Sequence, residues 1–188
     1  MKLIVLAAVF TAALTSANAA TAPTFTLMPA VASGQPGTVT GWGYDITNTD
    51  PANFLVLDDS NVSGGLSTGT FGTYVDYVAS NFIVINPGAS TGPVNFSLGT
   101  AGVGEFDLVQ FLPPNTKITG AINIDYSMFS QDPNSPNFDP GSFITSGTVS
   151  ADAAVQVVPE PGTAFLLAAA SLALGLAFRG RCGARVAD

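Results

Sequence analysis

Two acidic residues at close spacing are the first candidates for chemistry in this sequence. Glu105 and Asp107 are two positions apart, so on an extended strand their side chains would share one face at roughly 7 Å. Glycosidases use a pair of carboxylates about 5 to 10 Å apart across a cleft. Acidic residues are also common on the solvent face of a strand. The spacing therefore keeps a secreted hydrolase as an alternative and assigns no catalytic residue.

A loop with several oxygen donors is the candidate metal site. The candidate ligands within the proline-rich segment 130–141 are Asp132, Asn134, Asn137 and Asp139. Calcium binds about six to eight such oxygens, but the spacing does not match an EF-hand, which needs its own glycine and a final glutamate. Asp and Asn beside proline are also ordinary turn formers. We favour a plain polar loop and no cofactor, with calcium as the alternative.

The residues needed for other common catalytic sites are missing or isolated. The sequence has no histidine, and its one cysteine, Cys182, follows the last apolar stretch. The region 20–158 therefore lacks a disulfide, a thiolate nucleophile and a zinc site of the usual Cys/His type. A Ser–Lys hydrolase would have to use Lys117, the only lysine of that region. We expect Lys117 at a strand edge, where lysine opposes edge-to-edge pairing.

The region between the chain ends is strongly acidic. Only 10% of the 188 residues are charged, and between Ala20 and Val158 one base stands against eleven acids, a net charge of −10. An acidic surface repels the phosphates of nucleic acids, so we expect no nucleic acid partner. The same charge discourages docking of this region on anionic lipid.

Hydrophobic and polar residues alternate through the middle of the chain. A period of two is clearest over 42–46, 71–77, 118–126 and 149–157, and shorter apolar runs occupy 53–57 and 82–85. Turn-forming residues separate these segments, and no helical stripe occurs between them. We predict an all-β domain over 20–157, an antiparallel two-sheet sandwich of seven to nine strands, immunoglobulin-like or jelly-roll-like, with 130–141 as a long loop.

The aromatic residues of these strands have two possible roles. Trp42 and its neighbouring tyrosines and phenylalanines could stack on sugar rings, which keeps a carbohydrate-binding module as an alternative. Alternating aromatic residues in a sandwich more commonly fill the core. We therefore predict that Trp42 packs between the sheets.

The first 19 residues have the three parts of a signal peptide. Lys2 precedes a 12-residue apolar run over 3–14, and the sequence Ala17-Asn18-Ala19 is a small-residue exit, so we predict cleavage before Ala20. The apolar run is too short to cross a hydrocarbon core about 30 Å thick. We therefore expect 1–19 to be removed on export.

The C-terminal end has a different three-part pattern. The motif over 158–163 begins with Val158, Pro159, Glu160, Pro161 and Gly162. An uncharged stretch over 162–178 follows, which as a helix would be about 26 Å long, near the lower limit for a membrane span. The tail 179–188 carries Arg179, Arg181 and Arg185, which would stay on the cytoplasmic side. This pattern predicts a single transmembrane helix with the preceding domain outside the cytoplasm.

The segment 158–188 resembles a PEP-CTERM sorting signal, in which a Pro-Glu-Pro motif, a short span and a basic cluster follow in that order. The resemblance implies that an exosortase, a membrane enzyme, processes the chain near Pro159–Pro161. The same motif also carries the label of an ice-binding-protein C-terminal domain. The family occurs in Gram-negative bacteria that make extracellular polysaccharide, so exopolysaccharide is a further expected partner.

Together these features predict a structural or adhesive protein without catalysis. We expect it to be exported, anchored in the inner membrane during sorting, and then placed in the cell envelope or outside the cell. A carbohydrate-binding module and a secreted hydrolase with paired carboxylates are the alternatives.

Overall fold

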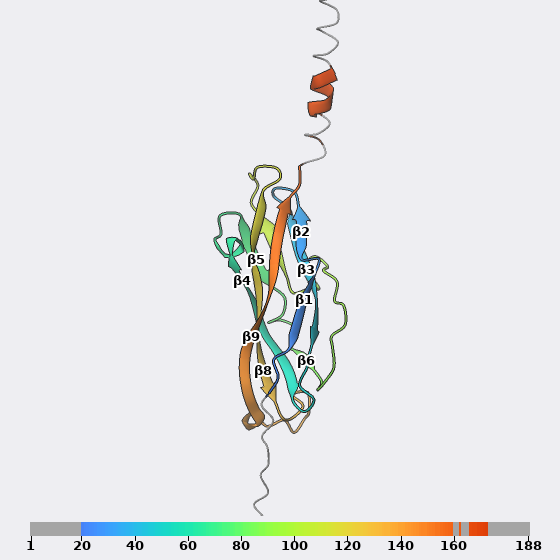
Figure 1. Ribbon diagram of the computed structural model, residues 1–188, viewed down its shortest axis with the longest axis vertical. Coiled ribbons are helices and arrows are strands. Elements are labelled where there is room, and N and C mark those ends of the chain that lie inside the picture. Colours follow the sequence, from blue (N-terminus) through green and yellow to red (C-terminus); the bar gives the residue numbers. More distant parts are fainter. Residues whose placement is uncertain (1–19, 160–161, 163–165, 173–188) are drawn as a thin grey trace, which may run out of the picture.

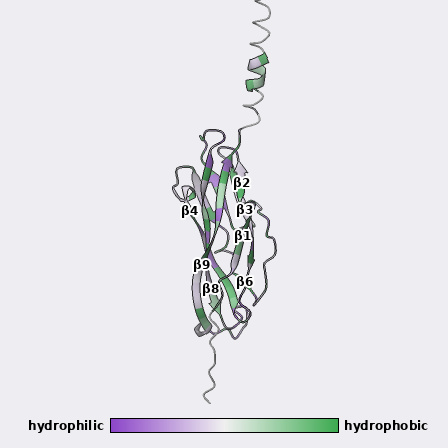
Figure 2. Cartoon of the chain, viewed as in Figure 1, coloured by the Kyte–Doolittle hydropathy of each residue, from purple (hydrophilic) through white to green (hydrophobic). Residues whose placement is uncertain are grey.

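The computed structural model describes residues 20–159, 162 and 166–172, and most of these form two packed β-sheets (Figure 1). The strands of this part are β1 (Thr24–Met28), β2 (Val31–Gly34), β3 (Val39–Thr47), β4 (Phe54–Gly64), β5 (Gly72–Asp76), β6 (Ile83–Ile85), β7 (Gly104–Leu108), β8 (Lys117–Phe129) and β9 (Phe143–Val157), with short 3-10 turns η1 (Gly65–Ser67) and η2 (Pro140–Ser142). The prediction of an all-β fold with two sheets is confirmed. Hydrophilic and hydrophobic residues both occur along the strands, as expected of strands with one buried and one exposed face (Figure 2).

Strand order divides the sandwich into a four-stranded sheet, β1-β3-β7-β5, and a five-stranded sheet, β2-β9-β8-β4-β6. Neighbouring strands are antiparallel, as predicted, except for β2 and β9, which are parallel. The reason lies at Pro29, which has no backbone N–H and ends the β1 ladder. The chain then crosses to the other sheet, where Ala154 donates to the carbonyl of Ala30 at 3.0 Å and β2 continues along β9.

A β-bulge makes β4 longer than the sequence predicts. The short apolar run over 53–57 was expected to end at the two aspartates, but β4 continues to Gly64 with a register shift between Leu57 and Asp59. The extra residue reverses which positions face inward, because side chains alternate with a period of two. Leu57 and Ser60 are therefore both buried, whereas Asp58 and Asp59 are both exposed. Adjacent residues of a regular strand point to opposite faces, so it is the bulge that brings both aspartates to the surface.

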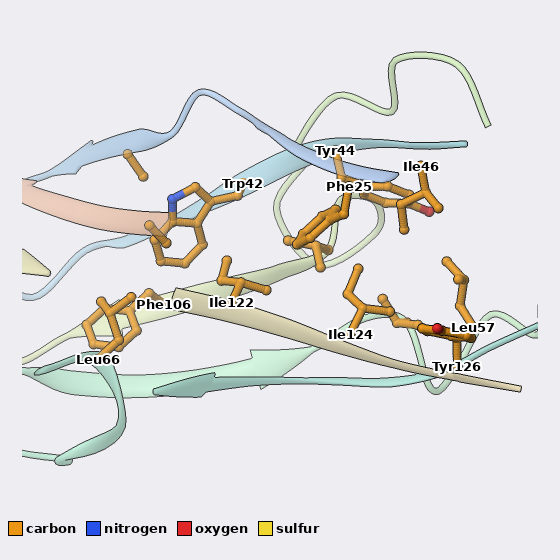
Figure 3. Close-up of a cluster of buried hydrophobic side chains, with 14 of the residues drawn as sticks. Phe25, Trp42, Tyr44, Ile46, Leu57, Leu66, Phe106, Ile122, Ile124 and Tyr126 are labelled. Atoms are coloured by element: carbon orange, nitrogen blue, oxygen red, sulfur yellow. The ribbon is translucent and has the colours of Figure 1, made fainter. Parts of the chain in front are cut away.

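Side chains from both sheets fill the space between them, and Trp42 lies among them with no exposed surface (Figure 3). Its ring meets the edge of Phe106, with centroids 6.4 Å apart and planes at 70°, an arrangement that adds to the energy of burial. The prediction that Trp42 packs in the core is confirmed. Within the described residues its indole N–H has no hydrogen-bond acceptor.

The glycines on either side of Trp42 allow a loop to approach the backbone of β3 closely. Val94 exchanges backbone hydrogen bonds with Tyr44 at 2.8 and 2.9 Å. A Cβ atom at Gly43 would lie closer than 3.0 Å to the carbonyl oxygens of Val94 and Met28. Glycine is needed on both sides of Trp42 because neighbouring residues come too close for a Cβ atom at either position.

A buried asparagine holds the end of the sandwich where β3 leads into β4. The Asn48 side chain has no exposed surface. Its amide Nδ2 donates to the carbonyls of Asn53 at 2.8 Å, Ile85 at 3.2 Å and Asn86 at 3.1 Å, and its Oδ1 accepts from the Asp50 N–H at 3.1 Å. One side chain therefore joins the β3–β4 turn to β6 and the loop after it.

Asp50 of the same turn joins the N-terminal segment to this end. Its carboxylate accepts from the backbone N–H groups of Ala52 at 2.9 Å, Asn53 at 2.8 Å and Thr21 at 3.1 Å. Burial alone would raise the pKa of Asp50, but these backbone donors favour the charged form and bring the pKa below its ordinary value.

Several sequence predictions fall outside the described residues. These are the signal peptide 1–19 with its exit residues Ala17 and Ala19, the motif residues Glu160 and Pro161, and the basic residues Arg179, Arg181 and Arg185. Of the expected span, residues 162 and 166–172 are described and are helical. Among the described residues, no helix is long and apolar enough to cross a membrane.

Candidate functional sites

The predicted sorting motif starts where the sandwich ends. Val157, the last residue of β9, is fully buried, and the Val158 N–H donates to the Gly34 carbonyl at 2.9 Å. Pro159 is exposed and cannot donate to a further ladder bond. The predicted motif residues Val158 and Pro159 are thus the point at which the chain leaves the sheet.

The carboxylate pair predicted on one strand does lie on β7, but the two groups have different surroundings. Glu105 accepts a hydrogen bond from the Tyr77 hydroxyl and a longer one, 3.4 Å, from the Gly99 N–H. Loss of water around the phenol, and then the bond to Glu105, raises the pKa of Tyr77. Asp107 is exposed, and neither acid lines the three surface hollows described below. Glu105 therefore acts as a hydrogen-bond acceptor for a neighbouring loop.

A buried serine that the sequence did not single out joins the two sheets. Ser60 of β4 hydrogen-bonds Asp76 and Tyr74 of β5, the latter at 2.7 Å, beside a hollow of about 380 Å³. Asp76 also accepts from the backbone N–H groups of Val78 at 2.7 Å and Ala79 at 3.0 Å. The carboxylate is therefore occupied by structural donors, and the chain has no histidine to act as base. Only the bulge in β4 turns Ser60 inward, so alternation along the sequence could not reveal it.

The proposed calcium loop uses its carboxylates to shape the backbone. Asp132 accepts from the Asn134 N–H at 2.9 Å, and Asp139 accepts from the Gly141 N–H at 2.8 Å at the start of η2. Phe138 from the same loop packs edge-on against Phe129, with centroids 5.2 Å apart. In the part of the chain that the structure describes, no group of three or more His, Cys, Asp or Glu side chains is placed to hold a metal ion.

Calcium is accordingly expected to leave the unfolding midpoint unchanged. The carboxylates of Asp132 and Asp139 are engaged by backbone donors, and calcium needs about six to eight oxygens converging on one point. Thermal unfolding followed by the fluorescence of Trp42, the only tryptophan, in excess calcium chloride and in EDTA tests this. A calcium-dependent rise that disappears in Asp132→Asn would instead assign the loop as a metal site.

The outer face of the five-stranded sheet carries a polar network around two opposed aspartates. Asp59 of β4 lies directly opposite Asp125 of β8 in the strand register. Asn61 donates to Asp125 at 3.3 Å, and Asn123 donates to Asn61 at 2.9 Å. Loss of surrounding water, and then the charges of Asp125 and other nearby aspartates, raises the pKa of Asp59. On this face, side-chain hydrogen bonds coexist with repulsion between the negative charges of Asp59 and Asp125.

Replacing Asp59 by asparagine is expected to stabilise the fold at pH 7 by about 0.5 kcal/mol, since like charges directly opposite each other are destabilising and solvent screens them. Because the folded-state pKa is raised, ionisation of Asp59 weakens the folded state. That penalty is absent below the ordinary carboxyl pKa and grows as the pH rises through the folded value. The gain should therefore fade toward about pH 3.

Urea unfolding at both pH values, followed by Trp42 fluorescence, measures this difference. Asp107→Asn, which removes an exposed acid from the other sheet, is the matched control and should change little. Equal stabilisation by both variants would mean that overall charge, and not the opposed pair, sets the effect.

An apolar hollow lies beside the point where the chain leaves the sandwich. Its volume is about 490 Å³, and we call the residues that line it the apolar tip: Pro36, Gln110, Phe111, Leu112, Pro113, Pro114, Val158 and Pro159. A third hollow, which Lys117 and Asp152 help to line, lies nearby on the five-stranded sheet.

Lys117 begins β8 with an exposed side chain in an inner strand of that sheet, so the expectation that it lies at a sheet edge is wrong.

These features define an all-β sandwich with a C-terminal extension. A scan of the chain against models of protein families finds no match, and a search of curated proteins finds no relative.

Proposed function

We propose that this chain is an exported, exosortase-sorted protein of the cell envelope or extracellular matrix, with a structural or adhesive role and no catalytic activity. The observation that carries this proposal is the abrupt end of the sandwich at Val158, with an exposed proline directly after it. A processing enzyme needs an extended, accessible segment, and the motif around Pro159–Pro161 follows without an intervening folded element. The resemblance of 158–188 to a PEP-CTERM signal implies that this processing enzyme is an exosortase.

The described part of the apolar segment supports a lipid environment for it. Every residue of 166–172 is exposed, including Leu166, Leu167 and Leu172 at about 70% each. These side chains are not covered by the sandwich, and exposed leucines in water are unfavourable. Ser171, the polar residue of this stretch, donates to the Leu167 carbonyl at 2.8 Å, a bond that satisfies a hydroxyl inside a helix without water.

The surface of the sandwich favours a structural or adhesive role over its alternatives. A carbohydrate-binding module would carry an exposed aromatic row on one sheet, whereas Trp42 is buried and the exposed phenylalanines lie in two separate loops (Phe82 and Phe111) and at the start of β9 (Phe143). A hydrolase would need two carboxylates facing a cleft, and Glu105 is engaged by Tyr77. The hydrogen-bonded polar face of the five-stranded sheet is the surface that we assign to contact with exopolysaccharide.

Within the sandwich class we infer an immunoglobulin-like arrangement. The order β1-β3-β7-β5 corresponds to the A-B-E-D order of that fold, and β9-β8-β4 corresponds to G-F-C. The strand β6 follows β5 in the chain but pairs with β4, so the match covers the central strands and departs at this edge.

Expression of the full chain with and without an exosortase tests the proposal. We expect the enzyme to shorten the protein near Pro159–Pro161 and release it from the membrane fraction. A variant with alanine at Pro159, Glu160 and Pro161 should keep its C-terminus and stay in the membrane fraction. Mass spectrometry of the C-terminal peptide and cell fractionation are the measurements.

The control is a variant with alanine at Pro133 and Pro136, which removes two prolines from the loop between β8 and β9 and should be processed normally. An intact C-terminus at Asp188 in the presence of active exosortase would reject the sorting proposal. A chain that never enters the membrane fraction would reject the anchor as well.

A further inference from the structure

The apolar tip exposes an aromatic side chain that the core does not use. Phe111 is 88% exposed, the highest value among the large hydrophobic side chains of the described residues. It lies on the loop between β7 and β8, beside Val158 and Pro159. Figure 1 shows this loop and the end of β9 at the same end of the sandwich, away from the loop between β8 and β9.

The loop that carries Phe111 is held in place by the sandwich. Leu112 packs against the hydrophobic core, and Val109 accepts from the Gly37 N–H at 3.1 Å. Asn115 donates to the Val157 carbonyl at 3.0 Å, which fixes the loop to the last residue of β9. The exposure of Phe111 is therefore built into the fold, and its position relative to the chain exit is fixed.

The distance from this tip to the apolar segment is short. Only Glu160 and Pro161 separate Pro159 from Gly162. Even fully extended, three residues span about 10 Å. The headgroup layer on each side of a bilayer is about 5 to 7 Å thick, taken as half the difference between total and hydrocarbon thickness. If 162–178 crosses a membrane, the tip must lie within or against that layer.

Charge distinguishes the tip from the rest of this acidic domain. The two loops that form it, 35–38 and 109–116, contain no acidic residue, and Lys117 follows directly. The turns at the opposite end carry Asp50, Asp132 and Asp139. Asp107 and Asp152 lie on the strands that lead to the tip, and Glu160 directly follows Pro159 in the chain. The two loops themselves add no repulsion from anionic lipid.

We propose that the apolar tip docks on the lipid bilayer that holds 162–178, with Phe111 inserted at the boundary between headgroups and acyl chains. The inference rests on the proposed membrane span and adds a second contact to it. Insertion removes the apolar side chain of Phe111 from water. It costs little additional translational and rotational entropy, because the membrane span already holds the sandwich at the bilayer surface. The docked tip holds the sandwich upright and presents its acidic end to the outside.

A fluorophore at the tip tests this contact in the full chain. Phe111→Cys in a Cys182→Ser background is labelled with an environment-sensitive dye and reconstituted in vesicles of phosphatidylethanolamine with a minor fraction of phosphatidylglycerol. The matched control is Phe82→Cys, which replaces another exposed phenylalanine, next to β6. We expect quenching by aqueous iodide to be at least about threefold weaker at position 111 than at 82, and quenching by nitroxide-labelled lipid to be stronger. Trp42 emission verifies that both proteins are folded.

The outcomes separate the docking from the anchor. A chain that does not float with the vesicles overturns both the span and the docking. A chain that floats, but whose label at 111 is as accessible to iodide as the label at 82, overturns the docking and leaves the span intact. Protection that disappears when the protein is diluted in excess lipid would show contact between copies of the chain, and it also overturns the docking.

Discussion

Substitution of Asn48 by leucine is expected to lower the free energy of unfolding by about 3 to 5 kcal/mol, a large part of the stability of a domain of this size. Leucine has the same branched arrangement and the same number of side-chain heavy atoms, so the change removes hydrogen bonds without opening a cavity. It leaves the carbonyls of Asn53, Ile85 and Asn86 and the N–H of Asp50 without their partner in a buried setting. Each such buried group costs about 1 to 3 kcal/mol, reduced where water can reach it.

Urea unfolding of the full chain, followed by Trp42 fluorescence, measures the loss. The control is Asn81→Leu, because the Asn81 side chain is exposed and donates to one carbonyl, that of Tyr77 at 2.6 Å. We expect a change of about 1 kcal/mol or less there. If both substitutions lower the free energy of unfolding equally, the buried hydrogen bonds of Asn48 do not stabilise the fold as its contacts indicate.

Substitution of Gly43 by alanine is expected to lower the free energy of unfolding by about 2 to 3 kcal/mol, because the added methyl group forces backbone apart. The new Cβ would meet the backbone carbonyl oxygens of Val94, in the loop between β6 and β7, and of Met28, in β1, which cannot turn aside as a side chain could. To make room, either the loop that covers β3 or β1 itself must move.

Gly69→Ala provides the comparison for this variant. Gly69 has a φ of 69° and open space around it, so alanine there is strained by backbone conformation alone, at about 1 to 2 kcal/mol. Amide hydrogen exchange locates the effect: in Gly43→Ala the N–H groups of Tyr44 and Val94, which pair β3 with the covering loop, should lose protection. Retained protection at both positions would mean that the methyl group is accommodated without displacing the loop.

Alternation alone predicted the class of fold and most of the strands. The apolar positions at 42–46, 118–126 and 149–157 recur every second residue, so they can bury one face only as strands, and they became β3, β8 and β9. The N-terminal strands were not predicted because β1 and β2 are short and separated by Pro29. They belong to different sheets because β1 pairs with β3 and β2 pairs with β9, and these pairings form only when the sheets assemble.

The candidate sites divide in the same way. The sorting motif and the apolar segment are local patterns of residue type, so the sequence predicts them without reference to the fold. Ser60 and Asn48 could not be predicted, since a bulge turns the first inward and the second is buried by β6, about forty residues further along the chain. Phe111 resembles other phenylalanines in sequence, and only its location beside the chain exit makes it a candidate membrane contact.

By itself the sequence determined the β class and the acidic character, and it predicts the two terminal signals, because these depend on composition and on periods of a few residues. The tertiary structure alone decided the parallel pairing of β2 with β9, the bulge that places two aspartates on one face, and the apolar tip at the exit of β9. These depend on which distant segments meet, and that is settled only when both sheets close over a shared core.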